Sequence, residues 1–240
     1  MAERAAIVTG GSSGIGLAVA RMLGTQGYKL TVAARRPEKL QGAVEGLRAD
    51  GIEVAEVAGN LADEETIKRV VADHRDRYGR LDVLVNNAGI GIGAAVGETE
   101  TKKLDIQLDV NLRSIILFYR ECLEMLRAAG ADHRKALVVN TASIAGKHGQ
   151  AWLAIYSATK HAVIGYTASM NHELAQEGIK SCALCPAYVD TPMTDFVKGQ
   201  VSPEEMIQPE DIAEAVRFLL SVSPQCIVPE IMFIRPGDAL

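Results

Sequence analysis

The stretch Ala5-Ala6-Ile7-Val8-Thr9-Gly10-Gly11-Ser12-Ser13-Gly14-Ile15-Gly16 decides the fold. Its apolar start predicts a short buried strand, and Leu17, Ala20 and Leu23 after the glycines recur at the spacing of a helix. Glycine lets the backbone approach a ligand closely, while the N–H groups and dipole at a helix start favour negative charge. The order strand, glycine turn, helix therefore predicts a phosphate-binding loop, although its spacing, Gly-x-x-x-Gly-x-Gly, differs from the common G-x-G-x-x-G fingerprint.

Segments of strand and helix character alternate through the rest of the chain. Further strands are expected at 28–34, 52–57, 81–85, 136–141, 179–185 and 226–234, and further helices at 37–50, 63–78, 104–126, 152–175 and from 208 onward. This alternation implies a parallel sheet with right-handed crossovers. We predict an α/β fold, a doubly wound three-layer Rossmann fold with a mostly parallel seven-stranded sheet, in which Pro229 marks an edge or a bulge.

Length and composition exclude several classes of protein. A chain of 240 residues is expected to form a single dinucleotide-binding domain over 1–240, with a substrate loop at about 187–208. The formal net charge of −5 gives no general attraction to nucleic acid or to an anionic membrane. No apolar run approaches the roughly 20 residues that span a bilayer, and the run near the start is too short for a signal peptide. We expect a cytoplasmic location.

The cysteines and histidines predict no metal site and no disulfide framework. Cys182 and Cys185 match a CxxC pattern, but they lie in a predicted strand, where residues three apart point to opposite faces. The five histidines show no spacing typical of metal ligands, so we interpret them as structural or surface residues.

Arg35 and Arg36 follow the second predicted strand, where dinucleotide folds place the residue that meets the adenine ribose. An acidic residue there would bind the ribose 2′-hydroxyl, whereas guanidinium groups suit a 2′-phosphate. The two arginines therefore favour NADP(H) over NAD(H). The alternative is that one or both only cap an exposed loop.

Polar residues follow several other predicted strands. Asn60-Leu61, the segment 86–89, Ser143 and the loop 186–192 come after the third, fourth, fifth and sixth strands. Because parallel strands end at one edge of the sheet, where such sheets bind ligands, these residues are expected to meet. The segment 86–89, Asn-Asn-Ala-Gly, also has the composition of a plain turn.

Tyr156 and Lys160 lie four residues apart in a predicted helix, so their Cβ atoms are expected about 5 to 6 Å apart on one face. A tyrosine has a pKa of about 10, and a nearby ammonium would lower it. Such pairs are also common on ordinary helix surfaces. Asn111, an amide among apolar neighbours, either satisfies local backbone or faces the cleft and holds a water.

Together these motifs resemble those of the short-chain dehydrogenase/reductase family in its compact single-domain branch. Thr9 to Gly16 resembles its TGxxxGxG loop, Asn86 to Gly89 its NNAG element, and Tyr156 to Lys160 its YxxxK motif. The resemblance covers about residues 5–234. It implies hydride transfer between a nicotinamide cofactor and a carbonyl or alcohol substrate.

The resemblance also implies roles for individual residues. Tyr156 would be the general acid/base, Lys160 would lower its pKa and bind the nicotinamide ribose, Ser143 would bind the substrate oxygen, and Asn111 would position a water for proton relay. The residues expected to contact the cofactor are Gly10, Ser12, Ser13, Gly14, Ile15, Gly16, Arg35, Arg36, Asn60, Leu61, Asn87, Ala88, Gly89, Tyr156, Lys160, Pro186, Val189 and Thr191.

Three positions depart from the family's pattern. Ala187 replaces a usual glycine, Asn60 stands where aspartate is commoner, and the segment 229–236 lacks the Gly-Gly tail resembling the fatty-acid-synthesis ketoacyl reductases, which argues against that pathway. The alternative function is a catalytically silent dinucleotide-binding sensor or scaffold, although such proteins typically lose the tyrosine or the lysine.

The resemblance further implies a homodimer or homotetramer packed through the helices at 104–126 and 152–175. The substrate is expected to be a moderately hydrophobic carbonyl or alcohol. Its apolar pocket is expected to be lined by Ile90, Ile92, Ala94, Trp152, Tyr188, Met193 and Phe196. The alternative for Ile90 and Ile92 is that they belong to the core.

Overall fold

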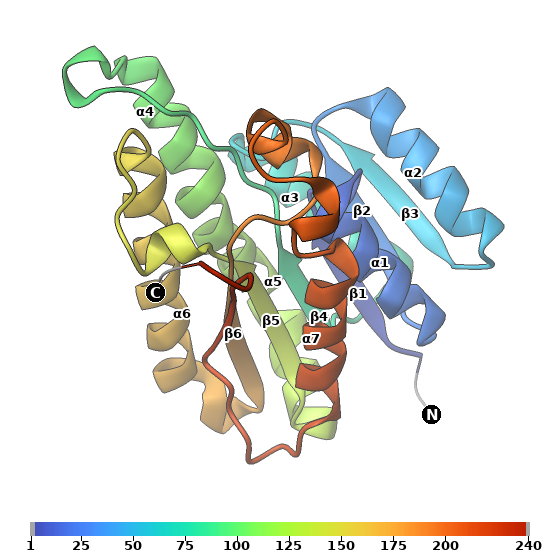
Figure 1. The fold of residues 1–240 in the computed structure, drawn as a ribbon. Coiled ribbons are helices and arrows are strands. Elements are labelled where there is room, and N and C mark those ends of the chain that lie inside the picture. Colours follow the sequence, from blue (N-terminus) through green and yellow to red (C-terminus); the bar gives the residue numbers. More distant parts are fainter. Residues whose placement is uncertain (1–2, 239–240) are drawn as a thin grey trace.

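Seven strands form one sheet that carries helices on both faces (Figure 1). The structure is a computed structural model that describes residues 3–238. The strands are β1 (Ala5–Thr9), β2 (Lys29–Ala34), β3 (Val54–Ala58), β4 (Val83–Asn86), β5 (Ala136–Thr141), β6 (Ile179–Pro186) and β7 (Glu230–Phe233).

The strand order is β3-β2-β1-β4-β5-β6-β7, and every neighbouring pair is parallel. The predicted fold is confirmed, and the sheet is all-parallel rather than mostly parallel. β1 and β4 are neighbours at the centre of the sheet, and the strand order reverses direction between them. Val8 of β1 pairs with Val32 of β2 on one side and with Val85 of β4 on the other. Ligands of open parallel sheets bind outside the strand ends at such a switch point.

Two apolar clusters fill the spaces between the sheet and its helices. Alternate residues of β1 serve each cluster: Ala6 and Val8 pack in one, and Ile7 packs in the other. Residues of α1, α2 and α7 belong to the first cluster, and residues of α3, α5 and α6 belong to the second. These helices are α1 (Gly14–Thr25), α2 (Pro37–Ala49), α3 (Glu64–Tyr78), α5 (Ser114–His133), α6 (Ala154–Leu174) and α7 (Pro209–Ser221).

The helix predicted at 104–126 is wrong as one continuous element. The structure has α4 (Thr101–Leu108), one π-helical turn over Asp109–Arg113, and then α5. In that turn the N–H of Ser114 donates to the carbonyl of Asp109, five residues back, so the regular ladder is interrupted. Asn111 lies inside the turn, and its side-chain amide binds the backbone of Ile90.

The last strand is shorter than the predicted 226–234. Lys180 donates its ammonium protons to the carbonyls of Ser223 and Cys226, which holds the preceding segment as a loop. Pro229 has no N–H for a ladder and lies just before β7, an edge strand, as its sequence indicated.

The structure also bears on the CxxC pattern and on the length of the apolar helices. Cys182 belongs to one apolar cluster and Cys185 to the other, so the two thiols point to opposite faces of β6. Within residues 3–238, no helix is both long enough and apolar enough to cross a membrane.

Candidate active site

The glycine turn between β1 and α1 forms a tight cradle at the switch point. Gly10 and Gly14 have positive φ values of 68° and 53°, which side-chain-bearing residues rarely adopt. A Cβ at Gly16 would stand 2.5 Å from the carbonyl oxygen of Gly10. The Ser13 side chain makes no capping hydrogen bond at the start of α1. The cradle thus leaves helix N–H groups for an anion.

The Asn-Asn-Ala-Gly segment after β4 is bound to this cradle rather than forming an isolated turn. The hydroxyl of Thr9 accepts hydrogen bonds from the N–H groups of Asn87 and Ala88 at 2.9 and 3.1 Å. The Asn87 side chain donates to the carbonyl of Thr9 at 3.2 Å and accepts from the Thr141 hydroxyl at 3.2 Å. Three strand ends are thereby fixed relative to one another.

Lys160 is buried, with 3% of its surface exposed, and its ammonium donates to the carbonyl of Thr141 at 2.7 Å. Its Nζ atom lies 5.5 Å from the centre of the Tyr156 ring. Burial lowers the pKa of Lys160 from 10.5 to about 8, because the interior disfavours the charged form. Tyr156 and Lys160 therefore share one face of α6, and the lysine is more deeply buried than the tyrosine.

The pKa of Tyr156 is raised in the structure, which differs from the expected lowering. Burial is the larger cause, and interaction with the side chain of Ser143 opposes it. Ser143 caps the short helical turn Ile144–Gly146 by accepting from Ala145 N–H at 3.1 Å, and it donates to the carbonyl of Pro186 at 3.4 Å. The ammonium of Lys160 donates to the Thr141 carbonyl and not to the Tyr156 hydroxyl.

Asn111 is brought to the same place by the π-helical turn. Its side-chain oxygen accepts from the N–H of Ile90 at 2.8 Å, and its amide donates to the Ile90 carbonyl and to the Thr159 hydroxyl. Gly89 separates this oxygen from Lys160, since a Cβ there would lie 3.4 Å from the oxygen and 3.5 Å from the ammonium. Asn111 therefore satisfies the backbone of Ile90, which is the first of the two alternatives, and its role in holding a water stays a prediction.

Arg35 and Arg36 lie exposed at the end of β2. Neither guanidinium makes an ion pair or a side-chain hydrogen bond with any residue between 3 and 238, although Arg36 occupies the cap position of α2. After β3, Asn60 is exposed and its side chain accepts from the N–H of Ala62 at 3.3 Å, while Leu61 is buried.

The loop after β6 reaches back to the glycine turn. A Cβ at Gly14 would stand 2.8 Å from the Thr191 methyl group, so Thr191 lies against the cradle. Val189 is buried and pairs with Ile207, and the Thr194 hydroxyl donates to the carbonyl of Val189. This part of the predicted substrate loop is anchored at both ends.

Three supporting residues were missed by sequence reasoning. Thr9 and Thr141 orient Asn87 and Lys160, and Gln107, fully buried, accepts from the N–H of Ile92 at 3.1 Å. The two threonines end β1 and β5, which is a signal that could have identified them. Gln107 carries no such signal, because its partner is the backbone of a remote loop.

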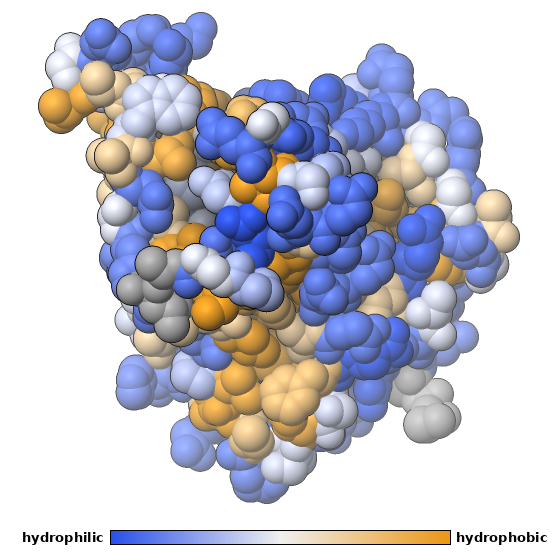
Figure 2. All heavy atoms as spheres, viewed as in Figure 1, coloured by the Kyte–Doolittle hydropathy of each residue, from blue (hydrophilic) through white to orange (hydrophobic). Residues whose placement is uncertain are grey.

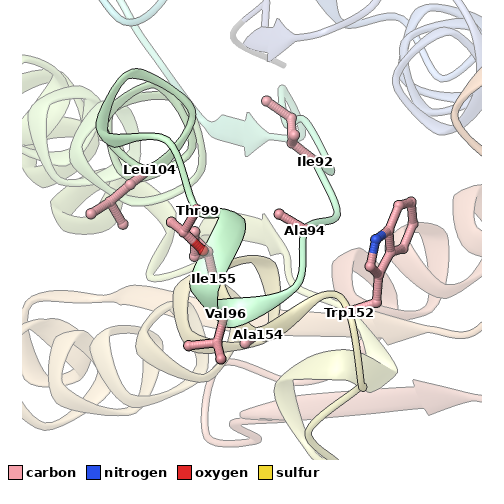
Figure 3. A pocket seen from close by; sticks show the side chains of 8 residues that line it. All are labelled: Ile92, Ala94, Val96, Thr99, Leu104, Trp152, Ala154 and Ile155. Carbon is pink, nitrogen blue, oxygen red and sulfur yellow. The ribbon is translucent and has the colours of Figure 1, made fainter.

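An apolar pocket is present at the start of α6, with a lining that differs from the predicted one. Ile92, Ala94 and Trp152 line it as expected, whereas Ile90, Tyr188, Met193 and Phe196 do not (Figure 3). The actual walls come from the loop after β4, the start of α4 and the start of α6 (Figure 3). Met193 and Phe196 instead lie exposed on the turn Pro192–Val197.

The histidines serve structural roles or lie at the surface. His74 is buried between the Thr31 hydroxyl and the Arg80 carbonyl, and burial lowers its pKa from 6.5 to about 4. His133 contacts the buried carboxylate of Asp82 at 2.8 Å. No cluster of three or more His, Cys, Asp or Glu side chains suited to a metal ion occurs between residues 3 and 238.

The fold and site define the class of doubly wound α/β proteins with a glycine-rich nucleotide cradle. Residues 4–201 match the family described as short chain dehydrogenase. The chain is 40% identical over 197 residues to a Streptomyces virginiae protein named as a monensin polyketide synthase putative ketoacyl reductase, covering 82% of this chain and 74% of that one. The chain therefore belongs to the short-chain dehydrogenase/reductase family and is an oxidoreductase of that family.

Two solved structures show the same architecture. An actinorhodin polyketide ketoreductase with NADPH matches at a TM-score of 0.86 and 33% identity, covering 96% of this chain and 95% of that one. A 3-ketoacyl-(acyl-carrier-protein) reductase from Brucella melitensis complexed with NADH matches at a TM-score of 0.86 and 26% identity, covering 98% and 97%.

Proposed function

We propose that this protein is an NADP(H)-dependent oxidoreductase that interconverts a carbonyl and an alcohol, with Tyr156 as its general acid/base. One observation carries the proposal: Asn111, Ser143, Tyr156 and Lys160 gather at the carboxyl edge of the sheet, next to the glycine cradle. The four residues come from the π-helical turn, from the segment after β5 and from α6, whereas an ordinary surface pair on one helix would not require the first two.

The cradle supports a bound dinucleotide. Gly10, Gly14 and Gly16 leave no room for side chains, and the uncapped start of α1 supplies N–H donors for a pyrophosphate. Ser12, Ser13 and Ile15 would line the same turn. Asn60 and Leu61 would meet the adenine, Asn87, Ala88 and Gly89 the ribose side, and Pro186, Val189 and Thr191 the nicotinamide end.

We propose that the 2′-phosphate of NADP(H) is bound by Arg35 and Arg36. Both guanidinium groups are exposed and without a protein partner between residues 3 and 238. No acidic residue stands between Ala34 and Pro37 to accept a 2′-hydroxyl. One similar structure contains NADPH and another contains NADH, so the fold alone does not decide between the two cofactors. The proposed preference for NADP(H) therefore rests on the two arginines.

When bound, the cofactor supplies the hydride that reduces the substrate carbon. Tyr156 would donate its proton to the carbonyl oxygen, and its raised pKa keeps that proton in place near neutral pH. Ser143 would hydrogen-bond the same oxygen as negative charge develops. Lys160 would hold the nicotinamide ribose, and the free lone pair of the Asn111 oxygen would accept a water that returns a proton.

The chain would form one dinucleotide-binding domain, and residues 187–208 would be its substrate loop. The substrate would carry an apolar group, because the pocket at the start of α6 is apolar. The relatives named as ketoacyl reductases add 3-ketoacyl thioesters to the carbonyl classes to be tried, against the expectation drawn from the missing Gly-Gly tail.

We also propose a homodimer or homotetramer. Phe218, Ile227, Met232 and Ile234 are between 42% and 50% exposed, and Figure 2 shows apolar surface gathered over α7 and the segment leading to β7. This patch supports self-association, and packing through α5 and α6 stays a prediction. Size-exclusion chromatography with light scattering tests it, and a monomer at micromolar concentration would contradict it.

The test of function is an NADPH-linked screen of ketones, aldehydes, quinones, sugars and ketoacyl thioesters. The proposal expects NADPH oxidation with at least one of these classes. Tight NADPH binding with no oxidation across the whole panel would favour the alternative, a catalytically silent dinucleotide-binding sensor.

A further inference from the structure

The turn before α6 holds Trp152 in a conformation that bulky residues disfavour. Its φ is +68°, and between residues 3 and 238 the only other non-glycine residue with a positive φ is Arg134, which ends α5. A tryptophan in the left-handed region persists only where its surroundings hold it there.

Contacts with the loop after β4 supply that restraint. The N–H of Ala94 donates to the carbonyl oxygen of Trp152 at 2.8 Å. The indole ring lies directly over Gly93, since a Cβ at that glycine would stand 2.3 Å from the ring carbon Cε3. The indole therefore packs against the backbone of Gly93, in the space that a side chain at this position would occupy. This packing site at Gly93 is called the seat of the indole.

The same loop is fixed on its other side. Gln107 accepts a hydrogen bond from the N–H of Ile92, and Asn111 accepts one from the N–H of Ile90. Both amides are fully buried. Anchors at Ile90, Ile92 and Ala94 leave the loop little freedom, so the surface it forms with Trp152 exists before any ligand binds.

This surface bounds a pocket of about 260 Å³. The lining is mostly apolar, and its polar side-chain groups are the Thr99 hydroxyl and the Trp152 indole N–H. It consists of Ile92, Ala94, Val96, Thr99, Leu104, Trp152, Ala154 and Ile155 (Figure 3). The Thr99 hydroxyl is already bonded to the Ala95 carbonyl. An apolar cavity of about 150 Å³ accommodates a benzene ring. The pocket therefore has room for two fused rings.

The pocket lies at the start of the helix that carries the proposed catalytic tyrosine. Ile155 lines the pocket and directly precedes Tyr156, and a Cβ at Gly91 would stand 3.7 Å from the Tyr156 ring. Trp152 is 60% exposed, and no residue between 3 and 238 accepts a hydrogen bond from its indole N–H. The indole thus offers an open apolar surface and a donor on the loop that leads into the helix of Tyr156.

We propose that Trp152 is a specificity-determining residue, whose indole is the platform for a flat aromatic or cyclic group of the carbonyl substrate. The substrate class is a ketone that carries such a group next to the carbonyl. This inference rests on the proposed carbonyl reductase function. It gives Trp152 a role in substrate selection and Gly93 a role in supporting the indole, and neither residue belongs to the family's motifs.

A pair of methyl ketones tests the proposal kinetically. Butan-2-one and 2-acetylnaphthalene share the reacting group and differ in the apolar part. Trp152→Ala should lower the ratio of kcat/KM for the naphthyl ketone over butan-2-one by roughly tenfold, through KM, and Trp152→Phe should restore part of it. An equal loss on both ketones, or an unchanged ratio, would overturn the proposal.

A matched glycine pair separates the platform from general disturbance. Gly93→Ala places a methyl group where the indole lies and should lower the same ratio, whereas Gly97→Ala meets no atom within 4 Å and should leave the ratio unchanged. If Gly93→Ala behaved like Gly97→Ala, the indole would not depend on this seat and the proposal would fail.

Fluorescence gives a readout that does not need turnover, because Trp152 is the one tryptophan of the chain. The naphthyl ketone should quench its emission saturably in the native sequence and weakly in Gly93→Ala. Saturable quenching without reduction of either ketone would support the platform and reject the reductase function. Quenching that stays linear with concentration, alongside active reduction, would reject the platform alone.

Discussion

The Nζ atom of the buried Lys160 lies 5.5 Å from the centre of the half-buried Tyr156 ring. The two groups have opposite responses to burial. The interior raises the pKa of the phenol and lowers that of the ammonium to about 8. Tyr156 therefore stays protonated near neutral pH, whereas the pKa of Lys160 lies close to neutral pH.

This arrangement predicts the pH dependence of carbonyl reduction. Reduction requires protonated Tyr156, which persists because its pKa is raised, and charged Lys160, which is lost as pH rises through about 8. The value of kcat/KM for the substrate should accordingly fall above about pH 8, since this parameter reports the free enzyme. A profile that stays flat between pH 7 and pH 10 would reject the assigned role of the Lys160 charge.

Charge reversal at the end of β2 should change the cofactor preference. Arg35→Asp is expected to weaken NADPH binding about 10- to 100-fold, because a charge-assisted hydrogen bond contributes about 1.5 to 3 kcal/mol. NADH binding should change little. Arg77→Asp, an exposed arginine on α3, is the control for net charge. Equal affinity of the native protein for NADPH and NADH, measured by calorimetry, would contradict the preference.

Two glycines distinguish the cradle from an ordinary helix surface. Gly16→Ala places a Cβ 2.5 Å from the Gly10 carbonyl oxygen and should abolish detectable NADPH binding. Gly42→Ala, exposed within α2 with no atom inside 4 Å, should instead stabilise the fold by about 0.5 to 1 kcal/mol. Thermal unfolding and NADPH titration of both variants provide the comparison. Unchanged NADPH affinity in Gly16→Ala would show that the turn is not the phosphate site.

His74 should make stability depend on pH. Its folded pKa of about 4 lies below its ordinary value of 6.5, so the unfolded state binds more protons between these values. Stability is present above pH 6.5 and is lost as pH falls towards 4, by roughly 3 kcal/mol in total. Urea unfolding should show this slope in the native protein and lose it in His74→Gln, while His172→Gln, an exposed histidine, keeps it. The same slope in both variants would assign the effect to other groups.

The sequence predicted the fold and the pairing of Tyr156 with Lys160 because both depend on local spacing, whereas the roles of Asn111 and Ser143 came from the family resemblance. The alternating segments require a parallel sheet, and Tyr156 and Lys160 share a face at helical spacing. The π-helical turn at Asn111 was not predictable, because it results from side-chain bonds to Ile90, a residue remote in sequence. The raised pKa of Tyr156 was also missed, since burial of a phenol is a property of tertiary packing.

The pocket lining was predicted only in part for a similar reason. Trp152 was expected in the pocket as an apolar residue, but its positive φ and its packing over Gly93 arise from a contact between two loops. Met193 and Phe196 were expected in the pocket from their apolar character. The turn that carries them, fixed by the Thr194 hydroxyl, instead leaves both side chains exposed.

The most direct measurement is the turnover of Tyr156→Phe with a carbonyl that the native protein reduces, together with its affinity for NADPH. Removing the phenol oxygen leaves the ring in place, so NADPH should bind as before. Reduction should fall by a factor of about 100 to 10,000, as expected when a general acid is lost. Full turnover by Tyr156→Phe, with NADPH bound normally, would contradict the central claim that this tyrosine carries the proton.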